Sequence, residues 1–315
     1  MARTPLALFT YDRPEHTEAV LESLSRCARL DECDLHIYCD GPKNPEQLPA
    51  VKASRQVVRK WSALLNAEII ERDTNLGLSR SIVGGVTELC QKYGRVIVIE
   101  DDFVLNASFL DYMLQALDRY ADEPEVYQVS GYMFPVEHPA QPDAFFLPLT
   151  TTWGWATWDR AWRVFNWNAS DAWEALRGPK VRKRFDLDNS YPYSGMLEDK
   201  LKNQNDSWGI LFWWAVFKAG GLVLHPRVSL VWVGGFDGSG THCQDQLWSR
   251  TSPMPEGGWN TGASFSLPDK VLADHAAFDR IKRFLRNERY PSSLTGRLWK
   301  KLGRYAERRS RISPG

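Results

Sequence analysis

Residues 95–102 read Arg-Val-Ile-Val-Ile-Glu-Asp-Asp, an unbroken apolar run that ends in three carboxylates. A short run of Val and Ile without polar alternation is typical of a strand buried on both faces of a parallel sheet. We therefore expect residues 95–99 to form a central strand, with Glu100, Asp101 and Asp102 at its carboxyl end. Because ligands of open α/β sheets bind at that edge, the same stretch predicts where a site would lie.

The sequence on either side alternates short apolar runs with amphipathic stretches, which predicts an α/β fold. Turn signals such as Asp40-Gly41-Pro42 separate the units. The expected strands are residues 6–10, 35–39, 67–71, 95–99 and 126–130, and the expected helices are residues 14–27, 51–65, 79–93 and 108–120.

After residue 136 the sequence becomes rich in Pro, Thr and Trp and loses this repeat. We expect residues 1–136 to form the α/β half, and residues 137–275 to form a mixed region of the same domain, packed on the same sheet. The apolar run 208–217 is about half the ~20 residues of a membrane span, so it predicts a buried helix. Residues 276–315 are expected to form a basic, amphipathic helical tail.

The composition limits the function classes. The 315 residues are 43% hydrophobic and 25% charged, which excludes a disordered or collagen-like chain. Lys and Arg (39) balance Asp and Glu (39), so no net charge attracts nucleic acid. The five cysteines lack a C-x-x-C pair, and the N-terminus lacks a signal-peptide pattern. These features predict a cytoplasmic protein.

Three adjacent acids at a strand end repel one another unless a counter-charge is present. A divalent cation resolves the conflict, and all-oxygen ligation suits Mg²⁺ or Mn²⁺. The alternative is a solvated turn whose carboxylates cap the helix expected at 108–120.

Four segments in this order carry a family resemblance. They are TYDRP at 10–14, YCDG at 38–41, TNLGLSRSI at 74–82 and VIVIEDDFVLNASFLDYM at 96–113. Together they resemble nucleotide-sugar glycosyltransferases of the GT-A fold, especially the N-acetylglucosaminyltransferase I type and bacterial members of glycosyltransferase family 2, over about residues 5–245. The resemblance implies a Rossmann-like, mostly parallel sheet flanked by helices.

The resemblance also implies roles for the donor-side residues. Asp102 would coordinate Mn²⁺ or Mg²⁺, while Glu100 and Asp101 would contact the donor ribose and sugar. Further donor-side contacts would come from the pair Asp12 and Arg13, from Asp40 at the uracil edge, and from Arg80. Each of these residues could instead be an ordinary turn or surface residue.

The catalytic base is expected on a loop that leads into an acceptor-side helix. Asp206, just before the apolar helix that begins at Trp208, matches that place, and Asp199 and Glu198 compete with it. Asp206 could instead be the N-cap of that helix.

Aromatic and glycine-rich segments follow where related enzymes close the site. Trp153, Trp155, Trp158 and Trp208 could stack on a sugar or could pack in the core. The loop 234–242 could fold over a diphosphate, with His242 completing the metal or phosphate site, or it could be a surface loop. In the tail, residues 278–311 hold twelve Lys or Arg against three acids. That tail could lie on an anionic membrane at its inner face or pack on the domain.

The resemblance therefore implies a metal-dependent, inverting hexosyl- or N-acetylhexosaminyltransferase. It would use a UDP-linked donor and a glycan or lipid-linked glycan acceptor in bacterial surface polysaccharide synthesis. The alternative is a nucleotide-sugar or carbohydrate-binding module without turnover. A nucleotidyltransferase is disfavoured, because TYDRPEH holds no basic, glycine-rich loop.

Overall fold

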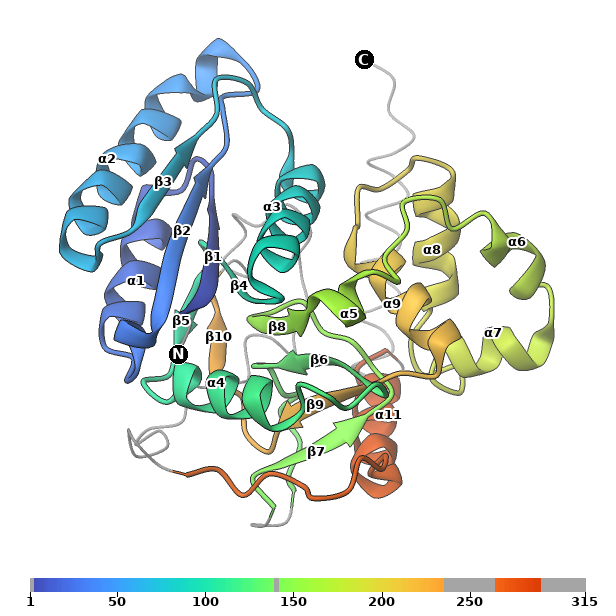
Figure 1. Ribbon diagram of the computed structural model, residues 1–315. Coiled ribbons are helices and arrows are strands. Elements are labelled where there is room, and N and C mark those ends of the chain that lie inside the picture. Colours follow the sequence, from blue (N-terminus) through green and yellow to red (C-terminus); the bar gives the residue numbers. More distant parts are fainter. Residues whose placement is uncertain (1–2, 139–141, 235–263, 290–315) are drawn as a thin grey trace.

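The computed structural model describes residues 3–138, 142–234 and 264–289. Its centre is an eight-stranded sheet in the order β3-β2-β1-β4-β8-β6-β9-β7, and a two-stranded sheet pairs β10 with β5 (Figure 1). The strands are β1 (Thr4–Thr10), β2 (Cys33–Cys39), β3 (Glu68–Glu71), β4 (Arg95–Glu100), β5 (Phe103–Leu105), β6 (Val126–Ser130), β7 (Ala144–Leu147), β8 (Trp155–Trp158), β9 (Leu222–Pro226) and β10 (Val231–Val233).

The helices fall between and after these strands. They are α1 (Pro14–Ser25), α2 (Leu48–Leu65), α3 (Leu78–Tyr93), α4 (Phe109–Arg119), α5 (Asp159–Trp162), α6 (Asp171–Ala175), α7 (Pro179–Phe185), α8 (Tyr193–Leu201), α9 (Gly209–Ala219) and α11 (His275–Arg289), with short 3-10 turns at Leu30–Glu32 and Pro45–Gln47. Within the described ranges no helix is long and apolar enough to cross a membrane.

The expected α/β fold is confirmed. Strands β3, β2, β1 and β4 are parallel, as a βα repeat requires. Residues 96–99 of β4 are fully buried, so this strand is central as its composition predicts. Helix α3 lies between Gly77 and Gly94, which both have φ of +79°, a conformation that glycine adopts without strain.

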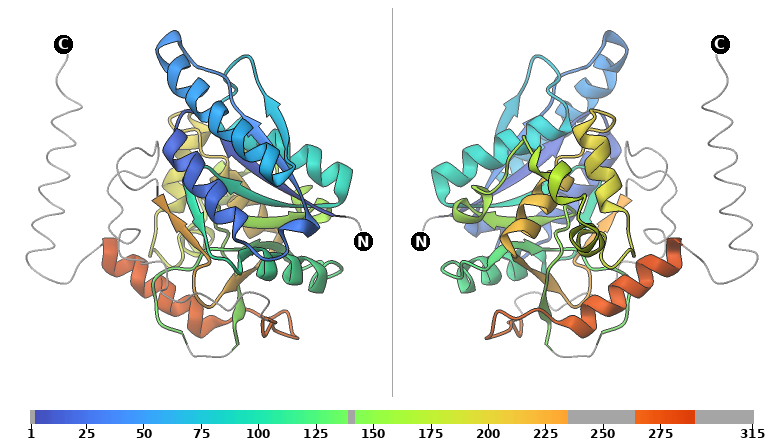
Figure 2. Two further views of the ribbon diagram at one scale, coloured as in Figure 1. Left: turned by 90° about the vertical axis from the view of Figure 1, so that its left-hand side faces the viewer. Right: turned by 90° about the vertical axis from the view of Figure 1, so that its right-hand side faces the viewer.

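Helices cover both faces of the sheet. Residues of α1, α2 and α4 form one core with Leu6 and Leu8 of β1, and residues of α3, α5 and α9 form another with Ala7 and Phe9. Because adjacent residues of a strand point to opposite faces, these two cores lie on opposite sides of the sheet. Figure 2 shows α1 and α2 on one side of the molecule and α6, α7 and α8 on the opposite side.

The second half of the sheet is mixed. β8 pairs antiparallel with both β4 and β6, and β6 pairs parallel with β9. The segment 152–158, which was expected where related enzymes close the site, thus contains a strand of the central sheet. Its side chains Trp155 and Trp158 are 0% and 4% exposed.

A third core joins the C-terminal helix to the mixed region. Ala277, Ile281 and Leu285 of α11 are buried together with Phe185 and Trp213. Residues 275–289 therefore pack on the domain. Residues 290–315, the rest of the expected basic tail, lie outside the described part, and so does His242.

Candidate active site

The three carboxylates lie where β4 ends beside β1. Oδ1 of Asp101 pairs with Nη2 of Arg13 at 2.7 Å, and its Oδ2 accepts a hydrogen bond from the backbone N–H of Tyr11 at 3.2 Å. Asp101 is only 3% exposed. It therefore ties the ends of the two neighbouring strands together.

Asp102 has a different environment. Its Oδ2 lies 3.4 Å from Nη1 of Arg13, while its Oδ1 is buried and accepts no hydrogen bond from the residues that the structure describes. A buried acceptor without a donor is costly, so this oxygen fits a role as a ligand to a cation. Its backbone carbonyl accepts from Gly234 at 2.7 Å, which sets the start of the expected glycine-rich loop beside it.

Three carboxyl groups share this strand end with one guanidinium, so ionising all of them together is unfavourable. Burial, together with Asp102 and Asp101, raises the pKa of Glu100 well above its ordinary value, and burial raises the pKa of Asp101 to about 7. A divalent cation would offset this charge. Among the described residues no three His, Cys, Asp or Glu side chains surround one point as a ready-made metal site. A metal on Asp102 would therefore take its other oxygens from water and substrate phosphates, as Mg²⁺ commonly does.

A cavity of about 360 Å³ connects this cluster with a distant part of the chain. Arg13, Glu100 and Asp102 line it from the strand ends, and Asp206 and Trp208 line it from the segment that enters α9. Trp153 also lines it, whereas Asp101 does not. The cavity thus brings together four of the residues that sequence analysis assigned to donor, metal and base, which are Arg13, Glu100, Asp102 and Asp206.

Asp206 has the geometry of an accessible carboxylate. Its side chain is 64% exposed and accepts a hydrogen bond from Nζ of Lys200 at 2.9 Å, while its backbone carbonyl accepts from the hydroxyl of Ser79. The interpretation of Asp206 as the N-cap of α9 is wrong. The hydroxyl of Ser207, not the carboxylate of Asp206, accepts a hydrogen bond from a backbone N–H of the first turn, that of Ile210 at 3.4 Å.

The competing base candidates lie elsewhere. Glu198 pairs with Arg182, and Asp199 is exposed on α8. Neither residue lines the cavity. Of the three candidates for the catalytic base, only Asp206 shares a cavity with Glu100 and Asp102.

Asp40 does not take the expected place at a base edge. Its Oδ1 accepts from the N–H groups of Gly41 and Leu76, and its Oδ2 accepts from those of Leu76 and Gly77, at 2.9 to 3.2 Å. An ionised carboxylate has about four acceptor positions, so these contacts occupy all of them. With 7% exposure, Asp40 anchors the loop before α3, and this corrects its expected role.

Two other donor-side residues also lie outside the cavity. Asp12 accepts from Nε2 of Gln47 at 3.3 Å, and Arg80 lines a separate groove on α3. Neither residue lines the cavity, although the charge of Asp12 contributes to the raised pKa of Asp101.

Only two of the four tryptophans expected to stack on a sugar reach the cavity. Trp153 and Trp208 line it. The stacking role is wrong for Trp155 and Trp158, because both are core residues. Trp155 packs against Trp208 with ring centroids 5.4 Å apart, and Nε1 of Trp158 donates to the carbonyl of Leu117 at 3.1 Å.

Sequence reasoning missed a polar and aromatic wall of the cavity. Tyr191, Tyr193 and Asn205 line it, together with residues 150–152. Burial raises the pKa of Tyr193, so its hydroxyl stays protonated. The cluster Tyr191-Pro192-Tyr193 was the available signal, but a short aromatic cluster is equally typical of a core.

Comparisons with known proteins give likeness in structure only. No protein-family model and no curated protein matches the chain. Among solved structures, the chain is similar to GalNAc-T7 with UDP, GalNAc and Mn²⁺ (TM-score 0.44, 9% identity, 73% of this chain and 43% of that one). It is also similar to mouse xyloside xylosyltransferase 1 (0.37, 15%, 69% and 81%) and to S. aureus TarS 1-349 (0.36, 13%, 50% and 47%). The chain thus spans less than half of TarS and of GalNAc-T7.

Proposed function

We propose that the chain is a metal-dependent, inverting glycosyltransferase that moves a hexosyl or N-acetylhexosaminyl group from a UDP-linked donor to a hydroxyl of a glycan. The observation that carries this proposal is the cavity of about 360 Å³. It holds an arginine and two carboxylates on one side, and a separate, exposed carboxylate on the other. Transfer from a nucleotide sugar needs both a donor half, which binds the diphosphate, and an acceptor half, which removes a proton from the attacking hydroxyl.

The donor half supplies charge complementarity. Asp102, with its unpartnered Oδ1, is the residue that would hold Mn²⁺ or Mg²⁺. When bound, such an ion would neutralise the charge that develops on the diphosphate leaving group. Arg13 adds a guanidinium at the same edge, where it can contact phosphate oxygens. Glu100 lines the same side of the cavity, where its carboxyl group can form a hydrogen bond with a sugar hydroxyl.

The acceptor half supplies a base. Asp206 would take the proton from the acceptor hydroxyl as the oxygen attacks the anomeric carbon, and the bond from that carbon to the diphosphate breaks. The ion pair with Lys200 orients the carboxylate. Trp153 and Trp208 supply apolar wall area for the sugar ring.

A screen of nucleotide sugars tests this function. UDP-linked sugars are expected to raise the unfolding midpoint in the presence of Mn²⁺, because a ligand that binds only the folded state stabilises it. With a bacterial polysaccharide fragment as acceptor, the protein should then release UDP. Binding without any UDP release would instead identify a non-catalytic nucleotide-sugar-binding module, and no binding of any nucleotide sugar would contradict both functions.

A further inference from the structure

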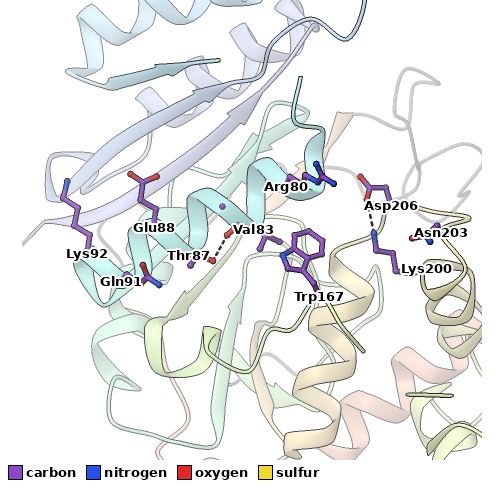
Figure 3. Close-up of a pocket in the computed structure, with 11 residues that line it drawn as sticks. Arg80, Val83, Thr87, Glu88, Gln91, Lys92, Trp167, Lys200, Asn203 and Asp206 are labelled. Carbon is purple, nitrogen blue, oxygen red and sulfur yellow. Dashed lines mark hydrogen bonds and ion pairs between the residues drawn. The ribbon is translucent and has the colours of Figure 1, made fainter. Parts of the chain in front are cut away.

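A second hollow, a groove of about 1040 Å³, lies on the outer face of α3 (Figure 3). Helix α3 contributes Arg80, Gly84 and Gln91, which recur at helical spacing on one face. Trp167, from the loop between α5 and α6, faces this helix across the groove, and Asp206 closes one end.

The groove meets the cavity at Asp206. Among the described residues, Asp206 alone lines both hollows. A molecule lying along α3 would therefore present one end to the carboxylate that we propose as the base.

Gly84 leaves the backbone of α3 bare inside the groove. A glycine in a helix interior costs about 1 kcal/mol relative to alanine, so it needs a reason. At Gly85 the reason is packing, because a Cβ would lie 2.9 Å from the ring of Phe9. At Gly84 a Cβ would meet nothing within 4 Å. The helix backbone at Gly84 is therefore open, so a ligand in the groove can approach it closely.

The opposite wall has the chemistry of a sugar site. Trp167 is 46% exposed, and Nζ of Lys200 lies 5.8 Å from its ring centroid. Exposed aromatic area beside polar groups suits sugars, which carry apolar C–H faces and hydroxyl rims. Gln91 and Asn203 add amide groups to the lining.

We propose that this groove binds the acceptor as an extended oligosaccharide, whose terminal hydroxyl reaches Asp206. The stretch from Arg80 to Gln91 covers roughly 16 Å of helix axis, which is long enough for several sugar residues. This inference rests on the proposed function, because it assigns the groove to the acceptor of that reaction.

Glycan binding by groove variants tests the proposal. The probe is an array of immobilised bacterial and mammalian oligosaccharides. Gly84→Gln is expected to weaken binding at least tenfold by filling the groove, and its unfolding midpoint should not fall, because glutamine is the better helix former. Gly195→Gln is the matched control, since Gly195 is also helical with open space around it but lies outside both hollows.

Trp167→Ala provides a second variant, and Trp173→Ala is its control. Trp173 is 42% exposed with a lysine over its ring, yet it does not line the groove. Loss of binding in Gly84→Gln and Trp167→Ala, with both controls as wild type, supports the proposal. Equal binding by all variants, or no glycan bound by the wild type, overturns it. Glycan binding without UDP release from the wild type would count against the proposed transferase function alone.

Discussion

Nζ of Lys200 lies 2.9 Å from Oδ1 of Asp206, at the point where the cavity and the α3 groove meet. The side chain of Lys200 is only 14% exposed, whereas that of Asp206 is 64% exposed. The ammonium is thus held against the protein while the carboxylate remains accessible. This arrangement fixes the direction of the carboxylate without covering it.

Asp206→Asn is expected to lower turnover by about 10²–10⁴-fold, because a carboxamide cannot accept the acceptor proton. Donor affinity should remain, since the acceptor-side carboxylate is not needed to hold the nucleotide. The free energy of unfolding should change by no more than about 1 kcal/mol, as for other exposed ion pairs. UDP release with acceptor, donor binding and chemical denaturation measure the three quantities.

Asp199→Asn is the matched control for this change. Asp199 is a nearby exposed carboxylate that does not line the cavity, so its variant should turn over as the wild type does. If Asp199→Asn or Glu198→Gln lost turnover with the fold intact, while Asp206→Asn kept it, the base would lie on α8 instead.

Asp102→Asn should remove the Mn²⁺-dependent part of UDP binding. The buried Oδ1 of Asp102 accepts no hydrogen bond within the described chain, so it is the oxygen best suited to a cation. Calorimetric titration with UDP, with and without Mn²⁺, measures the effect. Asp118→Asn is the control, because Asp118 pairs with Arg95 at the opposite end of β4. Unchanged Mn²⁺ dependence in Asp102→Asn would refute the assignment.

Asp40→Asn is expected to lower the free energy of unfolding by about 1–3 kcal/mol. An amide keeps one acceptor oxygen, so the N–H of either Gly77 or Gly41 loses its partner, whereas that of Leu76 keeps one. Asp73→Asn, an exposed carboxylate close to the same loop, should have little effect. Urea denaturation compares the two variants. If Asp40→Asn instead bound UDP more weakly at unchanged stability, the expected contact of Asp40 with the uracil edge would be supported.

The parallel half of the fold could be predicted because its signals are local. Each strand and helix from residue 4 to residue 100 is a contiguous run with its own periodicity. β8 could not be predicted in the same way. It is four residues long, and what makes it a strand is pairing with β4 and β6, which are distant in sequence. The same pairing buries Trp155 and Trp158.

The site residues also differ in whether their signals are local in sequence. Glu100 and Asp102 follow directly from the end of a buried strand. The role of Asp40 depends on N–H groups of a loop 36 and 37 residues later, and no sequence pattern reports that contact. Asp206 reaches the cavity because α9 packs against α3 and β8, so only the fold distinguishes it from Asp199 and Glu198.

The buried His225 of β9 allows a test of how stability depends on pH, because it is not part of the carboxylate cluster. Its ring is fully buried, with Nε2 2.9 Å from the carbonyl of Leu149 and Nδ1 3.3 Å from that of Tyr132. Burial lowers its pKa to about 4, from an ordinary value of 6.5. The half-buried His138 also opposes its protonation. The folded state therefore holds this imidazole neutral.

Because the pKa of His225 is lower in the folded state, the unfolded state binds more protons between pH 6.5 and pH 4, and stability falls as the pH falls through that window. Between pH 7 and pH 5, His225 should account for a loss of about 2 kcal/mol. The glutamine of His225→Gln does not titrate. The loss in free energy of unfolding between pH 7 and pH 5 should therefore be about 2 kcal/mol smaller in this variant than in the wild type, whatever the variant's stability at pH 7. Urea denaturation at both pH values measures the difference, with the exposed His275→Gln as control. An unchanged difference in His225→Gln would show that this imidazole is not the group that titrates.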